Sequence, residues 1–154
     1  MICLIIQACS SGGSVGLSKE VLSSPAGFLQ WQQNEILLKK SVQDHLRSYQ
    51  REQSLEVLQE YEGAVRAYLD HGFELYRAYE KTHKPLPSDL IPSLESRTDL
   101  LMDVADEYIK HGSLALGEGI ADDMVHDYSD LPAMARAQRR AEALLMRYRY
   151  RQDY

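Results

Sequence analysis

A proline-rich stretch at residues 84–92, with the sequence Lys-Pro-Leu-Pro-Ser-Asp-Leu-Ile-Pro, constrains the fold of this chain more than any other feature. Pro85, Pro87 and Pro92 each lack a backbone N–H, and each ring clashes with the turn before it, so the stretch cannot lie within a helix. On both sides of it, apolar residues recur at helical spacing. We therefore expect residues 84–92 to form the corner of a long antiparallel helical hairpin.

The region before the corner has a helical pattern. Residues 28–81 contain no proline, and their apolar side chains recur at steps of three and four, which indicates one apolar helix face. Ser24-Pro25 predicts the start of this region, since proline is favoured at the first helical position. A polar sequence at residues 48–54 interrupts the face. A helix of more than about 50 residues would be unusually long, so one continuous helix and two helices meeting at residues 48–54 both stay open.

The region after the corner is also helical. Ser93 predicts the N-cap of a helix that continues to about Tyr128. Residues 112–119 are rich in small side chains, which indicates either a tight helix–helix crossing or a helix break at residues 117–119. The sequence Asp-Leu-Pro at residues 130–132 predicts the start of a last helix.

Two glycines lie inside the helical pattern before the corner. Gly63 and Gly72 each cost up to about 1 kcal/mol relative to alanine in a helix. Close approach of a neighbouring backbone is the reason we expect for both.

These patterns predict the fold class. The sequence contains no hairpin dipeptide between alternating runs and few clusters of β-branched residues, so nothing in it indicates a strand. We expect an all-α protein with a long antiparallel helical hairpin plus a C-terminal helix, forming a three- or four-helix bundle. Residues 25–154 would make up this single helical domain, which is long enough to bury a core.

The charge of the chain is unevenly distributed. Its net charge of −6 disfavours nucleic acid as a partner. Residues 93–130 contain two basic and ten acidic residues, a net −8, whereas residues 131–154 contain six and two, a net +4. We expect the two segments to pack together and neutralise each other. The alternative is that the arginine-rich end binds an acidic partner or anionic lipid headgroups. The candidate partner-binding residues there are Arg147, Tyr148, Arg149, Tyr150 and Arg151.

The N-terminus has a different composition from the rest. A short apolar run leads to a small residue and a cysteine, and residues 10–24 are rich in Ser and Gly, as a flexible tether would be. The sequence Ile6-Gln7-Ala8-Cys9 resembles the end of a bacterial lipoprotein signal peptide. The resemblance implies that Cys9 is lipidated and that residues 1–9 are a residual signal segment. With Ser10 directly after the cysteine, it also implies the periplasmic face of the outer membrane.

A short motif occurs twice in the helical region. Tyr-x-x-His-Gly is found at residues 68–72 and again at residues 108–112. If the hairpin folds symmetrically about residue 87, His71 faces Asp103 and His111 faces Gly63.

This pairing suggests two interpretations of the histidines. Asp103, Glu107 and His111 are spaced by four and share one helix face. Together with His71 they are weak candidates for a metal or proton-linked site in a helical bundle. Because neither His71 nor His111 belongs to the Glu-x-x-His motif of such sites, we favour the other interpretation, in which both histidines fill a seam beside glycine and hydrogen-bond to carboxylates. We therefore predict no metal.

No catalytic motif is recognisable. A Gly-x-Ser-x-Gly sequence occurs only at residues 12–16, inside the Ser/Gly-rich tether, and the helical body at residues 25–154 has no such motif, no glycine-rich phosphate loop and no cysteine. We expect no enzyme and no cofactor. The expected function is that of a non-enzymatic envelope lipoprotein that binds or positions another protein, with a homodimer through helical faces as a further expectation. The alternatives are a soluble helical metal-binding or sensing protein that uses His71 and His111, and a cytoplasmic helical adaptor or immunity-type protein.

Overall fold

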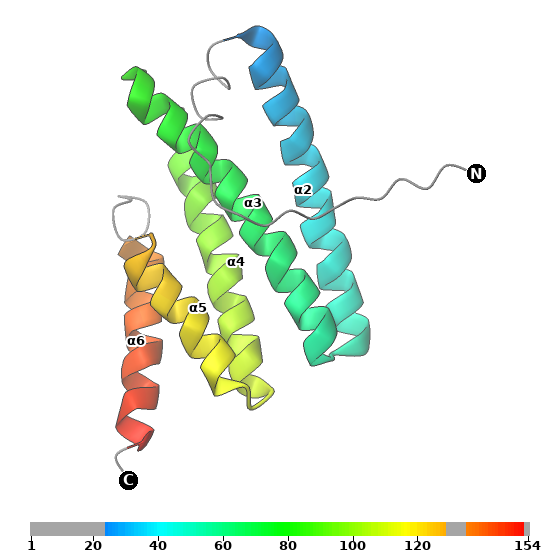
Figure 1. The fold of residues 1–154 in the computed structure, drawn as a ribbon, viewed down its shortest axis with the longest axis vertical. Coiled ribbons are helices and arrows are strands. Elements are labelled where there is room, and N and C mark those ends of the chain that lie inside the picture. Colours follow the sequence, from blue (N-terminus) through cyan, green and yellow to red (C-terminus); the bar gives the residue numbers. More distant parts are fainter. Residues whose placement is uncertain (1–23, 129–134, 153–154) are drawn as a thin grey trace, which may run out of the picture.

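The computed structural model describes residues 24–128 and 135–152, with side chains as far as Tyr148. These residues form helices and no strand, which confirms the all-α prediction (Figure 1). In chain order the described helices are α2 (Pro25–Glu52), α3 (Leu55–Thr82), α4 (Leu90–Lys110), α5 (Leu114–His126) and α6 (Ala135–Gln152).

The first helical region consists of two helices. Ser24 caps α2 as predicted, because its side chain accepts a hydrogen bond from the backbone N–H of Gly27 at 3.0 Å. The break falls inside residues 48–54, where Gln53 adopts a left-handed conformation with φ 48°. Ser54 then caps α3 by accepting a hydrogen bond from Val57 N–H. The serine side chain satisfies one of the N–H groups that the break leaves free.

The proline-rich corner is shorter than predicted. α3 ends at Thr82 and α4 begins at Leu90, so the prediction that Ser93 is the N-cap is wrong. Pro92 fits in the first turn of α4, where the N–H groups have no helical partner and a missing one costs little. The Ser93 hydroxyl instead accepts hydrogen bonds from Arg97 at 3.3 and 3.1 Å.

The second break lies at Gly112, between α4 and α5. Its φ of +79° is a left-handed conformation that favours glycine. The expectation of one helix to about Tyr128 is therefore wrong, and so is the alternative of a break at residues 117–119, since these residues lie inside α5. A Cβ on Gly117 would lie 2.7 Å from Ile109 and 2.8 Å from the Ala105 carbonyl, so this glycine allows the tight crossing of α4 and α5.

The two glycines of α3 differ from each other. A Cβ on Gly72 would lie 2.8 Å from both Leu94 and Arg97, so the predicted close approach is confirmed there. A Cβ on Gly63 would meet nothing within 4 Å, and the same prediction is wrong for this residue.

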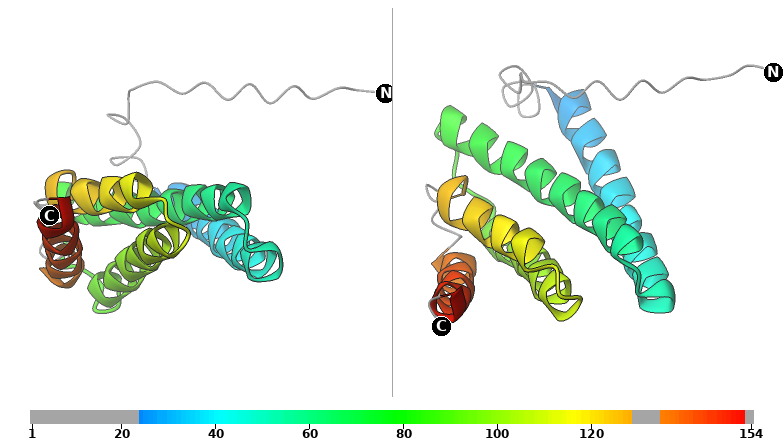
Figure 2. Two further views of the ribbon diagram at one scale, coloured as in Figure 1. Left: turned by 90° about the horizontal axis from the view of Figure 1, so that it is seen from below. Right: turned by 60° about the horizontal axis from the view of Figure 1, so that its bottom comes forward.

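The helices form a curved array rather than a closed ring (Figure 2). Each described helix packs against the next along the chain. Side chains also join each helix to the one after next: Tyr49 joins α2 to α4, Arg66 joins α3 to α5, and Arg140 joins α4 to α6. This packing of helices on their neighbours forms an all-α helical bundle, as predicted.

The core of the array is centred on α3 and α4. Its largest fully buried side chains are Tyr108, Phe73, Leu58, Leu69, Leu94, Leu101, Met102, Ile120, Met124, Val65 and Val104. None of the helices described by the structure is long and apolar enough to cross a membrane.

Candidate functional site

His71 joins α2 to α3. Its side chain is 8% exposed, and its ring stacks on Trp31 with centroids 4.6 Å apart. The imidazole Nε2–H donates to the Trp31 carbonyl at 3.0 Å, and the Trp31 indole N–H donates to the His71 carbonyl at 3.1 Å. The carboxylates of Glu35 and Glu74 lie 3.8 and 3.7 Å from the ring nitrogens. The predicted seam beside glycine and near acidic groups agrees with this geometry, but the predicted hydrogen bond to a carboxylate is wrong for His71, since its ring donates to a backbone carbonyl.

The predicted pairing across the hairpin is wrong. Asp103 accepts a hydrogen bond from Arg140 at 2.7 Å, and His111 contacts Tyr49 of α2 rather than Gly63 of α3. Gly72 of α3 lies against Leu94 and Arg97 of α4, and Glu62 accepts a hydrogen bond from Tyr108. Residues of α3 therefore lie opposite earlier residues of α4 than symmetric pairing about residue 87 predicts.

The two histidines belong to separate places in the fold. Their contacts on α2, Trp31 and Tyr49, are 18 residues apart. At 1.5 Å per residue this corresponds to about 27 Å along the helix. Within the described part of the chain, no group of three or more His, Cys, Asp or Glu side chains is arranged to hold a metal ion.

Glu107 and His111 meet at Tyr49. The Tyr49 hydroxyl donates to Glu107 at 2.8 Å, so its oxygen is left to accept from His111 Nε2 at 2.9 Å. Burial, followed by the hydrogen bond and charge of Glu107, raises the pKa of Tyr49 to about 12. A hydrogen bond from Lys110 lowers the pKa of the Glu107 carboxyl below its usual value.

This network lines a cleft that we call the Tyr49 cleft. Its volume is about 620 Å³. It lies between the C-terminal ends of α2 and α4, and Tyr61 of α3 also lines it. The lining residues are Leu46, Tyr49, Gln50, Gln53, Tyr61, Leu100, Asp103, Glu107, Lys110 and His111. It combines aromatic, aliphatic and acidic groups, which suits an amphipathic ligand better than a purely apolar one.

A second cavity, which we call the α2 groove, lies where the N-terminal half of α2 meets the α3–α4 corner. Its volume is about 640 Å³. The lining residues are Phe28, Leu29, Trp31, Gln32, Gln33, Glu35, Ile36, Leu75, Tyr79, Pro87, Asp89, Leu90, Ser93 and Arg97. Most of these side chains are apolar, and the groove opens beside Leu29 and Ile36, which are 56% and 69% exposed.

A buried ion pair lies beneath the α2 groove. Arg97 is 3% exposed and binds Glu35 with both terminal nitrogens. The same guanidinium donates to the Tyr68 carbonyl at 2.7 Å and lies 3.8 Å from the centroid of the Tyr68 ring. Arg97 therefore holds α2, α3 and α4 together. Sequence reasoning missed it, although a charged residue three after Leu94 and four before Leu101 interrupts the apolar face of α4.

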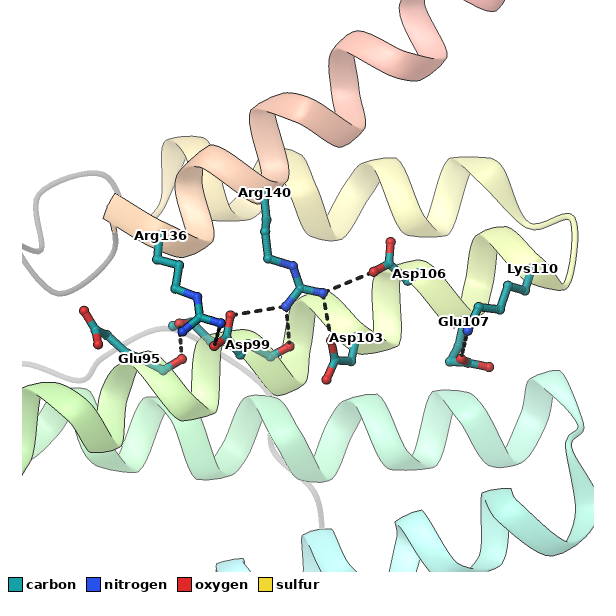
Figure 3. A network of polar contacts seen from close by, with 9 residues as sticks. Glu95, Asp99, Asp103, Asp106, Glu107, Lys110, Arg136 and Arg140 are labelled. Carbon is teal, nitrogen blue, oxygen red and sulfur yellow. Dashed lines mark hydrogen bonds and ion pairs between the residues drawn. The ribbon is translucent and has the colours of Figure 1, made fainter.

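Two of the six arginines in residues 131–154 pair with acidic residues of α4, in agreement with the predicted packing of the basic and acidic segments. Arg140 binds Asp99, Asp103 and Asp106 of α4, and Arg136 lies 3.6 Å from Asp99 (Figure 3).

The structure describes the side chains of only two of the five candidate partner-binding residues. Arg147 is exposed, whereas Tyr148 is 8% exposed and belongs to the core, so Tyr148 is not part of an exposed patch. The side chains of Arg149, Tyr150 and Arg151 lie outside the described part of the chain, as does Cys9 with the whole lipoprotein-like segment.

Comparison with known proteins gives no relative. No family model matches the chain, and no curated protein or solved structure is significantly similar to it.

Proposed function

We propose that this chain is a non-enzymatic binding or assembly accessory for another protein at the bacterial cell envelope, anchored to the outer membrane through a lipid on Cys9. The α2 groove is the observation that carries the binding part of the proposal. The lipoprotein-like sequence at residues 6–9 carries the location.

The α2 groove has the character of a helix-binding surface. Leu29, Ile36 and Leu37 are 56%, 69% and 65% exposed on the N-terminal half of α2. Clustered exposed apolar side chains mark interaction surfaces on soluble domains. A groove lined by apolar side chains from three helices suits the apolar face of an amphipathic partner helix.

The position of the groove agrees with an anchored protein. α2 begins at Pro25, directly after residues 10–24. Fifteen residues span at most about 50 Å when extended. A lipid on Cys9 would therefore hold the groove close to the membrane surface, within reach of partners that are themselves anchored there.

Two measurements test the proposal. In the native host, mass spectrometry of the mature N-terminus is expected to find a diacylglyceryl group on Cys9, and Cys9→Ser is expected to abolish membrane fractionation. An intact Met1 would contradict the location.

Binding is tested separately by site-specific photo-crosslinking at Ile36 in the same host. We expect one protein to be crosslinked from Ile36 and lost when Leu29→Glu is introduced, because a charge in the groove opposes apolar docking. Asn34→Glu, which adds the same charge to an exposed position of α2 outside the groove lining, is the matched control. Equal loss with both substitutions would exclude the groove.

A further inference from the structure

Tyr61 has a hydroxyl that is not used within the described fold. The side chain is 4% exposed, and the residue lies in the wall of the Tyr49 cleft. Its hydroxyl makes no hydrogen bond with any described residue. Every fully buried polar side-chain atom of the described residues has a hydrogen-bond partner, so the Tyr61 hydroxyl is not fully buried. Tyr61 lines both the Tyr49 cleft and an adjoining cavity of about 360 Å³, and the nearby Asp103 carboxylate lies on the side of the Tyr49 cleft. Burial and the nearby Asp103 charge raise the pKa of Tyr61, so it is a neutral phenol that can donate or accept.

Two carboxylates line the cleft together with this hydroxyl, and each already pairs with one cation, Asp103 with Arg140 and Glu107 with Lys110. Asp103 faces the cleft, and its Oδ1 accepts from Arg140 while its Oδ2 accepts no hydrogen bond among the described residues. Glu107 binds Tyr49 and Lys110. The cleft thus contains two carboxylates, one lysine that is already ion-paired, and His111.

Backbone dipoles also act at the cleft. Gln53 is the C-cap of α2 and His111 is the C-cap of α4, and both line the cleft. The carbonyl ends of two helices therefore lie at the cleft, and helix C-termini carry a partial negative charge that attracts cations.

The remaining walls are suited to an aliphatic stem. Leu46 and Leu100 lie on opposing helices, and the rings of Tyr49 and Tyr61 supply aromatic surface. Aromatic faces also attract ammonium and guanidinium groups.

From this juxtaposition we infer that the Tyr49 cleft binds an alkylguanidinium or alkylammonium group, with the cation at Tyr61 and Asp103 and its stem against Leu46 and Leu100. The group would be an Arg or Lys side chain of a partner protein or a free polyamine. An anion would face two carboxylates and two helix C-termini, and the cations Lys110 and Arg140 are already paired with those carboxylates, so the site favours a cation over an anion. The inference does not depend on the α2 groove or on lipidation.

The test uses isotope-labelled full-length chain and simple probes. n-Propylguanidinium and n-butylammonium copy the ends of Arg and Lys side chains, and butyrate has a similar stem with the opposite charge. We expect saturable shifts of the His111 ring resonances with both cations, with dissociation constants on the order of 1 mM, as is usual for ligands of so few atoms. Butyrate is expected to give none. Equal binding of butyrate, or no saturable shift with either cation, would overturn the inference.

Variants separate the site from general effects. Tyr61→Phe removes only the hydroxyl and is expected to weaken n-propylguanidinium binding about tenfold, because a hydrogen bond to a charged group is lost. Asp103→Asn keeps the size of the side chain and is expected to weaken it as well. Tyr79→Phe makes the same change in the α2 groove and is the matched control. Unchanged affinity in both Tyr61→Phe and Asp103→Asn would refute the assignment.

Two further probes distinguish the sources of the cation. The peptide acetyl-Ala-Arg-Ala-amide presents the group as a protein would, and spermidine presents it as a polyamine. Tighter binding of the peptide assigns the cleft to a protein partner, and tighter binding of spermidine assigns it to a polyamine. Failure of both to compete with n-propylguanidinium would contradict the inference.

Discussion

Glu35→Gln is the substitution that most directly tests how α2 is held. It removes one charge from the ion pair with Arg97 and keeps the side chain nearly the same size. Arg97 is 3% exposed, whereas the Glu35 side chain is 22% exposed at the edge of the α2 groove. The substitution therefore leaves a buried guanidinium without its counter-charge.

The expected loss of stability follows from that burial. Removing one partner of a buried ion pair typically costs about 3–5 kcal/mol, because the other charge stays buried and uncompensated. Arg97 would still keep the Tyr68 carbonyl, the Ser93 hydroxyl and the Tyr68 ring. We therefore expect the lower end of this range, about 3 kcal/mol.

Urea unfolding followed by far-UV circular dichroism measures this loss. With a urea m-value of about 1–3 kcal/mol per molar, the midpoint is expected to fall by about 1 M or more. Asp44→Asn breaks a surface pair with Arg47, whose side chains are 54% and 68% exposed, and is expected to change stability by less than about 0.5 kcal/mol. The double variant Glu35→Leu/Arg97→Met is expected to recover most of the loss, since apolar replacement of a buried pair is often neutral. A Glu35→Gln protein as stable as Asp44→Asn would refute the reasoning.

Three further predictions concern packing, pH and salt. Gly72→Ala is expected to destabilise the protein by about 1–3 kcal/mol because its methyl group would collide with Arg97, whereas Gly63→Ala, with open space around it, is expected to stabilise it by about 0.5–1 kcal/mol in the same urea assay. The free energy of unfolding is expected to fall as pH rises from 10 to 12, because the pKa of Tyr49 is raised to about 12 in the folded protein and the Tyr49 hydroxyl ionises at lower pH in the unfolded chain. Tyr49→Phe should reduce this pH dependence, and an unchanged slope would contradict the prediction. Arg140→Met is expected to cost about 1 kcal/mol at low salt and less at 1 M NaCl, because its three carboxylate partners are partly exposed; a loss that is independent of salt would point to packing instead.

The fold class and most helix positions could be predicted because they depend on local chemistry. The Ser24 cap and the proline corner follow from the hydrogen-bonding properties of single residues. The sequence indicated where a break near Gln53 would fall but not whether the helix breaks there, since the polar residues around Gln53 tolerate both a helix and a turn. The break at Gly112 could not be located from the sequence, because which glycine takes a positive φ depends on how α5 packs on α4.

The candidate site was only partly predictable because it depends on register between helices. The spacing of Glu107 and His111 placed them on one face of α4 correctly. Tyr49 lies 58 residues before Glu107, and nothing in its local sequence distinguishes it from the other tyrosines of the chain. The symmetric pairing of His71 with Asp103 was wrong because a one-dimensional pattern does not fix where a corner ends.

The curved array of helices also affects how the protein folds and which helices unfold first. Contacts run mainly between helices close in sequence, so contact order is low and rapid folding from local nuclei is expected. α4 is joined to helices on both sides, whereas α2 and α6 lie at the two ends of the array (Figure 1). In such arrays opening starts at the ends and spreads inward. Amide hydrogens of α4 are therefore expected to exchange most slowly, and α2, which carries one wall of each cavity, is expected to open before the centre of the molecule unfolds.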